Sequence, residues 1–96
     1  MVVIMYVILV YDISLEDNGS KNLRRIFKTC KKYLSHIQNS VFEGELTEAD
    51  LFKLRAELQP NIRQHCDSII IFKSRQEKWL DKEFWGRSED LTSNFL

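Results

Sequence analysis

The sequence predicts an α+β fold in which two helices cover one face of an antiparallel sheet, and three observations support this fold class. Two segments, Val2–Val10 and Ile69–Phe72, are apolar without interruption, which is typical of central strands buried on both faces. Two helical patterns, each with one apolar face, lie between them. A segment with looser alternation separates the helices. The elements therefore follow in the order strand, helix, strand or hairpin, helix, strand.

Length and composition allow one small domain. The chain has 96 residues, of which 44% are hydrophobic, enough for a packed core and too many for a disordered chain. Lys and Arg total 14, and Asp and Glu total 14. The net charge by itself therefore gives no argument for a nucleic-acid partner. With 3 Gly and 1 Pro, the chain is neither low-complexity nor collagen-like.

Targeting and redox signals indicate a cytoplasmic protein. The apolar run Met1–Tyr11 is too short to span a bilayer. It lacks a charged leading region and a small-residue cleavage site, and Asp12 follows at once, so it is not a signal peptide. Cys30 and Cys66 stand in no motif, whereas a secreted domain of this size usually carries several disulfides. We therefore expect two core thiols, a reducing cytoplasm and no membrane.

The first helix is expected from about Lys21 to Ser35, with Asn18 or Ser20 as its N-cap. Helical periodicity places the apolar residues of this segment in one arc, namely Leu23, Ile26, Phe27, Cys30, Tyr33, Leu34 and Ile37. The opposite arc holds no acidic residue and six cations, namely Lys21, Arg24, Arg25, Lys28, Lys31 and Lys32. One helix face is therefore entirely basic, although the whole chain is neutral.

The next segment, His36–Leu46, is either one strand or two short strands that turn near Asn39-Ser40, and both alternatives remain open. Thr47–Asp50 has the pattern of a capping box at the start of the second helix. Pro60 lacks a backbone donor, so that helix kinks or ends there. Its expected apolar stripe is Leu51, Leu54, Leu58 and Ile62.

Elements in this order form the ferredoxin-like βαββαβ layout, which we assign to residues 1–73. Residues 74–96 are charged but contain large apolar side chains, namely Trp79, Leu80, Phe84, Trp85, Leu91, Phe95 and Leu96. These side chains pack either on the chain's own sheet or on a second copy. We predict a homodimer, in which an additional C-terminal strand of each chain packs on the partner and joins its sheet edge.

Asp12 is the candidate catalytic and metal-binding residue. It ends the most apolar strand of the chain, so a buried element holds its carboxylate at the rim of the sheet. A turn or capping role is the alternative. Mg²⁺ takes about six oxygens, usually from one or two carboxylates, waters and a substrate phosphate. A dimer axis near Asp12 supplies the second carboxylate, and an ion between the two polarises a phosphodiester and activates a water.

The basic face of the first helix is the candidate nucleic-acid-binding surface, with a merely solvated face as the alternative. Its cations repel one another at i,i+4 spacing, and a bound polyanion relieves that repulsion. The contacts would go to phosphates, so binding would be independent of base sequence and steeply dependent on salt. The residues assigned to this surface are Lys21, Arg24, Arg25, Lys28 and Lys32.

Other polar residues are expected to have structural roles. Glu43 and Glu45 flank Gly44 and share one strand face, where a solvated surface is favoured over a metal site. His36 has no evident partner, and the neighbours His65-Cys66-Asp67 do not converge on one ion in a strand or loop. The sequence contains no nucleophile elbow, no Walker loop, no dinucleotide glycine pattern and no CxxC pair.

Together these residues resemble the CRISPR-associated protein 2 family. The most specific stretch is Gln38–Thr47, which reads QNSVFEGELT. The strand end Tyr11-Asp12-Ile13, the Arg24-Arg25 pair on the basic helix and the strand Asp67–Phe72 match as well. The similarity covers residues 4–73, with a looser match in the tail.

The resemblance implies a ferredoxin-like subunit in a tight homodimer, with residues 38–46 in a hairpin. It implies a Mg²⁺-dependent endonuclease for single-stranded RNA or double-stranded DNA, with Asp12 of both subunits as the metal and catalytic position. Arg24 and Arg25 match a basic, phosphate-binding pair, and Phe42 matches an aromatic residue of the hairpin. The family also joins the CRISPR-associated integrase, protein 1, to insert new spacers.

Two functions therefore remain. One is a CRISPR-associated, metal-dependent endonuclease that takes part in spacer acquisition. The other is a non-catalytic, dimeric DNA-binding bridge for the integrase. An RNA-recognition module is disfavoured because its aromatic strand motif is absent. A toxin-like ribonuclease of the same fold stays open, because a fold does not determine function.

Overall fold

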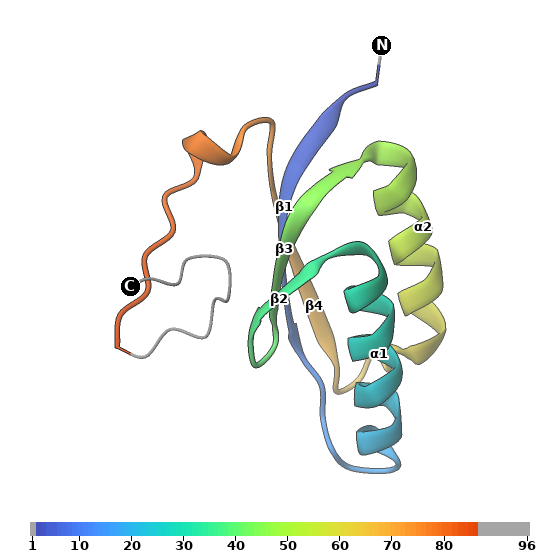
Figure 1. Ribbon diagram of the computed structural model, residues 1–96. Helices are drawn as coiled ribbons and strands as arrows, with labels where there is room; N and C mark the ends of the chain where they lie inside the picture. Colours follow the sequence, from blue (N-terminus) through green and yellow to red (C-terminus); the bar gives the residue numbers. More distant parts are fainter. Residues whose placement is uncertain (1, 87–96) are drawn as a thin grey trace.

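The computed structural model describes residues 2–86 and has two helices on one face of a four-stranded antiparallel sheet with strand order β2-β3-β1-β4 (Figure 1). Its elements are β1 (Ile4–Asp12), α1 (Gly19–Tyr33), β2 (Ser35–Gln38), β3 (Val41–Thr47), α2 (Glu48–Leu58) and β4 (Ser68–Ser74). Short 3₁₀ turns cover Gln59–Asn61 and Glu77–Trp79. This arrangement confirms the predicted α+β, ferredoxin-like fold class.

Strand β1 is a central element, because it pairs antiparallel with both β3 and β4. Strand β4 lies at the edge of the sheet, so the prediction of a central position is wrong for the second apolar segment. Alternate residues of β1, namely Val7, Leu9 and Tyr11, lie in the core under the helices. The opposite sheet face, which we call the outer face, is also apolar. There Ile8 and Val10 of β1 stand opposite Phe72 and Ile70 of β4, which are 50% and 51% exposed. The unbroken apolar run thus reflects two apolar faces, of which the helices cover one.

The segment between the helices is a hairpin, which decides the alternative that the sequence left open. Strands β2 and β3 pair antiparallel, with a register shift between His36 and Gln38. They turn at Asn39 and Ser40, where Asn39 adopts a φ of 39°. Asparagine tolerates this left-handed conformation better than most residues. The turn therefore lies at a residue that tolerates a positive φ.

The helix boundaries follow local chemistry. Helix α1 begins at Gly19, where a Cβ would lie 1.9 Å from the carbonyl oxygen of Ser14, so the loop after β1 can approach this closely only at a glycine. Asn18 is its N-cap, but its side chain makes no capping hydrogen bond. At α2 the predicted cap is confirmed, since Thr47 Oγ1 accepts from the Asp50 N–H at 3.1 Å. Helix α2 ends at Leu58, and Pro60 lies in the following 3₁₀ turn.

The core lies between the helices and the sheet, and its largest fully buried side chains are Phe42, Leu9, Ile26, Leu54, Val7 and Cys30. Burial raises the pKa of the Cys30 thiol to about 12, so Cys30 behaves as a small apolar residue. Cys66 is only half-buried and outside this cluster. The expectation of two core thiols is therefore right for Cys30 and wrong for Cys66.

The chain leaves the sheet after β4 and continues on the side away from the helices (Figure 1). Lys82 anchors this segment to β3 through a salt bridge with Glu43, which also accepts a hydrogen bond from the Tyr6 hydroxyl. Residues 75–86 contain one 3₁₀ turn and no strand. Residues 87–96 lie outside the described part, so the additional C-terminal strand, the division at residue 73 and packing on a partner remain predictions.

The buried carboxylate of Asp67 ties the loop after β1 to the segment before β4. Its Oδ1 accepts from the Ser14 N–H at 2.9 Å, and its Oδ2 accepts from the backbone N–H and the Nε of Arg63, both at 2.9 Å. Arg63 in turn donates from Nη2 to the carbonyl of Ser14 and from Nη1 to that of Glu16, both at 2.6 Å. This network fixes the chain two residues after Asp12.

The bonds from Arg63 hold the pKa of Asp67 well below its ordinary value, and the same pair raises the pKa of Arg63. A depressed carboxyl pKa in the folded state contributes stability that is complete above the unfolded pKa and is lost as the pH falls toward the folded one. For Asp67 this loss begins near pH 3.8, the ordinary value. The network is therefore at full strength at neutral pH.

We expect Asp67→Asn to lower the free energy of unfolding at pH 7 by about 3 kcal/mol, because it leaves the half-buried Arg63 guanidinium without its carboxylate. Chemical denaturation monitored by far-ultraviolet circular dichroism measures this difference. The gap between wild type and variant should narrow as the pH falls below 3.8. The exposed Asp81 gives the control, since Asp81→Asn should change stability little. A gap that widens in acid would contradict the assignment.

Candidate functional site

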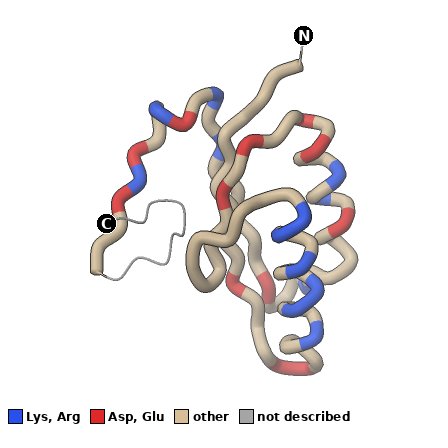
Figure 2. The backbone as a smooth tube through the Cα atoms, viewed as in Figure 1, with Lys and Arg blue, Asp and Glu red and all other residues tan. Residues whose placement is uncertain are grey.

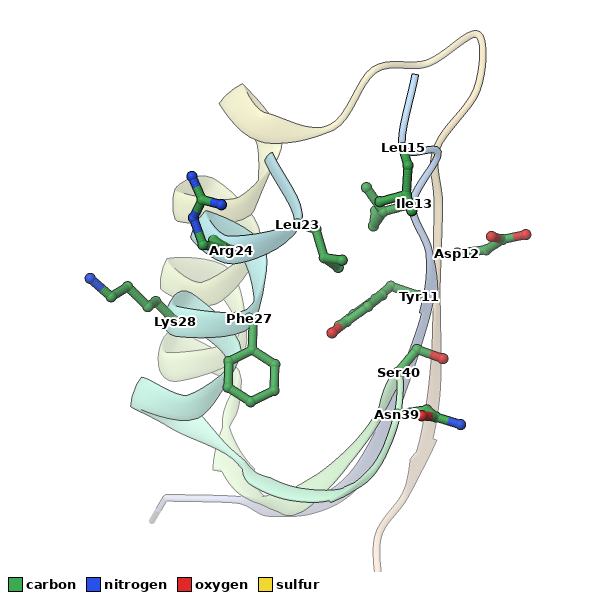
Figure 3. Close-up of a pocket in the computed structure, with 10 residues that line it drawn as sticks. All are labelled: Tyr11, Asp12, Ile13, Leu15, Leu23, Arg24, Phe27, Lys28, Asn39 and Ser40. Atoms are coloured by element: carbon green, nitrogen blue, oxygen red, sulfur yellow. The ribbon is translucent and has the colours of Figure 1, made fainter. Parts of the chain in front are cut away.

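Asp12 ends the central strand at the rim of the sheet. It pairs with Ser68 at the start of β4, and its side chain is exposed. The carboxylate points to the outer face, away from α1 (Figure 3). Asp12 therefore lies beside the half-buried Val10 and the exposed Ile70, at a point that the Asp67 network makes rigid.

One chain does not supply a complete metal site. Among residues 2–86 no three side chains of His, Cys, Asp or Glu lie together in a way that could hold a metal ion. Asp12 is thus a single carboxylate with open space around it. Mg²⁺ is commonly bound by one or two carboxylates, with waters and substrate phosphate completing its shell. The residues present fit Mg²⁺ if a second copy brings its own Asp12 to the same place.

Lys and Arg residues follow one another along α1 (Figure 2), where the basic face was predicted. All six cations are exposed, namely Lys21, Arg24, Arg25, Lys28, Lys31 and Lys32. Of these, Lys32 forms a salt bridge with Glu57 of α2 at 2.5 Å. Within the part of the chain that the structure describes, the other five form no salt bridge. The structure therefore brings together the residues assigned to nucleic-acid binding, with unneutralised charge on all but one.

A groove of about 800 Å³ separates the first half of α1 from the end of β1 and the β2–β3 turn. Leu23 and Phe27 of α1 face Tyr11 of β1 across it, and Arg24 and Lys28 stand at its helix side (Figure 3). Its further lining residues include Asp12, Ile13, Leu15, Asn39 and Ser40. Sequence reasoning missed this groove, because the lining comes from three separate segments. The one local signal was a tyrosine directly before the candidate aspartate.

The expectation of a solvated face holds for Glu45, which is exposed, and is wrong for Glu43. The Glu43 side chain is only 15% exposed and accepts from Tyr6 and Lys82. The Nε2 of His36 lies 2.9 Å from the Asn39 carbonyl, and its ring packs on Phe27 and Phe42 with centroids 4.9 Å away. In the His65-Cys66-Asp67 sequence, Asp67 belongs to the network with Arg63. Its importance was not evident from the sequence, because Arg63 and Ser14 meet it only in the folded chain.

No helix within residues 2–86 is long and apolar enough to cross a membrane.

Comparison with known proteins agrees with this geometry. A family model described as CRISPR associated protein Cas2 matches residues 5–82. A protein of Fusobacterium nucleatum named CRISPR-associated endoribonuclease Cas2 is 60% identical over 92 residues, which are 96% of this chain and 87% of that protein. A Moorella thermoacetica protein named CRISPR-associated endoribonuclease Cas2 2 is 43% identical over 93% of this chain and 99% of its own.

Two solved structures that resemble this chain are also Cas2 proteins. One described as "Crystal structure of cas2" aligns with a TM-score of 0.80 and 33% identity, covering 97% of this chain and 99% of that one. The structure of Streptococcus pyogenes Cas2 at pH 6.5 aligns with a TM-score of 0.64 and 35% identity, over 70% of this chain and 82% of that one. The sequence, the fold and these relatives together establish that the chain belongs to the CRISPR-associated protein Cas2 family.

Proposed function

We propose that this protein is a homodimeric, Mg²⁺-dependent endonuclease of CRISPR immunity that acts in the cytoplasm. The observation that carries the proposal is the position of Asp12, an exposed carboxylate at the end of the central strand and beside an uncovered apolar sheet face. Its relatives in Fusobacterium nucleatum and Moorella thermoacetica are named endoribonucleases. Those names favour RNA as the substrate, with double-stranded DNA as the second possibility.

Dimerisation is supported by the outer face. Ile70 and Phe72 expose about half of their surface there, next to the half-buried Ile8 and Val10. Contiguous exposed apolar surface of this kind marks an interface. A two-fold axis that passes through this face near the end of β1 would bring the two Asp12 residues to one site. The segment after β4 runs on the same side of the sheet, where it can extend the interface.

In this dimer, each Asp12 would contribute one carboxylate to the metal site. Mg²⁺, when bound, supplies charge that polarises the phosphodiester and lowers the pKa of a coordinated water. The Asp67–Arg63 network keeps the strand end in place, so little reorganisation is needed when substrate arrives. The cations of α1 project on the other side of the sheet (Figure 3), so they would bind phosphates of the same nucleic acid away from the bond to be cut.

A second function, a DNA-binding bridge for the CRISPR integrase in spacer acquisition, is favoured by one observation. Arg24 and Lys28 project from α1 on the side of the sheet opposite to the Asp12 carboxylate (Figure 3). Nucleic acid can therefore bind across the helices without reaching the carboxylates. In that case the dimer would place DNA for the integrase, and its own nuclease activity would not be required.

Cleavage tests the nuclease proposal. We expect the wild-type protein to cut single-stranded RNA or duplex DNA in Mg²⁺, and we expect Asp12→Asn and EDTA each to abolish the products on a denaturing gel. The exposed Asp17 provides the matched control, because Asp17→Asn removes a nearby charge and should leave cleavage unchanged. Equal cleavage by Asp12→Asn would place the chemistry elsewhere. No cleavage by either protein, with binding retained, would favour the bridge.

The salt dependence of nucleic-acid binding tests whether the basic face of α1 contacts phosphates. We expect log K for nucleic-acid binding to fall with log salt, and the double variant Arg24→Glu/Arg25→Glu should reduce the slope by about 2, since each lost phosphate contact removes about 0.9. Fluorescence anisotropy over a salt series measures the slope. Lys53→Glu/Arg55→Glu makes the same charge change on exposed positions of α2 and should alter it less. Equal effects of the two double variants would refute a specific α1 surface.

The oligomeric state of the protein tests whether the outer face is a dimer interface. Sedimentation velocity at micromolar concentration should give a dimer for the wild type and a monomer for Ile70→Lys/Phe72→Lys, because two buried charges would replace apolar contacts. Phe52 of α2 is 74% exposed, so Phe52→Lys is the control and should remain dimeric. A wild-type protein that sediments only as a monomer would remove both the dimer and the paired-carboxylate site.

A further inference from the structure

The groove between α1 and the end of β1 combines apolar walls with cations at its edge. Leu23 and Phe27 line it from the helix, and Leu15, which is 66% exposed, lines it from the loop after β1. Arg24 and Lys28 lie one helical turn apart beside it and form no salt bridge within residues 2–86. Such a site fits a ligand with a flat apolar body and a negative charge.

The hydroxyl of Tyr11 adds a second, independent observation. Tyr11 is only 6% exposed, and its hydroxyl points into the space that Leu23 and Phe27 face (Figure 3). In the described part of the chain this hydroxyl has no hydrogen-bond partner, whereas every fully buried side-chain polar atom there has one. Burial raises the pKa of Tyr11, so the group remains a donor at neutral pH. The hydroxyl oxygen is therefore not itself fully buried but opens into the groove, where a ligand atom can accept its hydrogen bond.

We propose that this groove binds one unpaired nucleotide of a single-stranded nucleic acid. The base enters between Leu23, Phe27 and Leu15 and accepts a hydrogen bond from the Tyr11 hydroxyl, while Arg24 and Lys28 contact the adjoining phosphates. A base in a duplex is stacked and paired, so its faces and edges are not available for this contact. The inference rests on the proposed function, because it takes nucleic acid as the ligand of α1.

Two consequences distinguish this site from the basic face alone. Contacts with phosphates are indifferent to the bases, whereas a base in the groove makes binding depend on unpaired bases. Asp12 also lines the groove, although its carboxylate points away from it. A base held in the groove would therefore lie beside the strand end that carries the proposed catalytic residue.

The test compares three fluorescent probes in EDTA by anisotropy: a short oligoadenylate, the same strand with abasic residues, and a blunt duplex. The full-length wild type should bind the abasic strand about ten-fold more weakly than oligoadenylate. Tyr11→Phe should weaken binding to oligoadenylate about three- to ten-fold and leave the other probes unaffected. Tyr33→Phe removes a hydroxyl that donates to Glu57 outside the groove and should change nothing.

A second variant keeps the test valid if Tyr11→Phe perturbs the core. Leu15 is largely exposed, so Leu15→Ala should fold normally and still weaken binding of oligoadenylate relative to the abasic strand. Equal wild-type affinity for the two strands, or no change in either variant, would overturn the groove proposal. If Arg24→Glu/Arg25→Glu also left all three probes unchanged, the proposed nucleic-acid function itself would fail. If only that double variant weakened binding, the proposed nucleic-acid function would stand and the groove proposal alone would fail.

Discussion

The Asp67–Arg63 network is the interaction on which the geometry of the site depends. It joins the loop that follows the central strand to the segment that leads into β4, and it does so with one buried carboxylate and one guanidinium. Because each oxygen of Asp67 is bonded, its charge is tolerated in the interior. The same bonds bring Ser14 against Gly19, where only glycine fits. The end of β1 and the start of α1 are thereby held together.

Two chemically different surfaces lie on opposite sides of the sheet. The outer face is apolar and has the Asp12 carboxylate at its rim. The helix side carries an unbroken row of cations on α1. Association through the first surface and nucleic-acid binding through the second do not compete. A small domain can therefore use one side to dimerise and the other to bind nucleic acid, and the groove at the strand end lies between them.

Much of the fold could be predicted from local patterns, because each pattern reports its own environment. The unbroken apolar run of β1 indicated a strand with two apolar faces, and the Thr47 cap and the stripe through Leu54 and Leu58 located α2. The basic arc of α1 needed only helical periodicity. The choice between one strand and a hairpin could not be made, because strand pairing is not local. Cys66 was misjudged because burial depends on which segments pack around it.

The sequence by itself determined the class of fold, the basic face and the position of Asp12 at a strand end, since these depend on residue order and periodicity. Only the tertiary structure decided what surrounds them. The groove unites Tyr11, Leu23 and Asn39 from three segments, and Asp67 acquires its role from Arg63 and Ser14. Such contacts join residues far apart in the chain, and their energies come from distance, burial and hydrogen-bond geometry. None of these quantities exists before the chain folds.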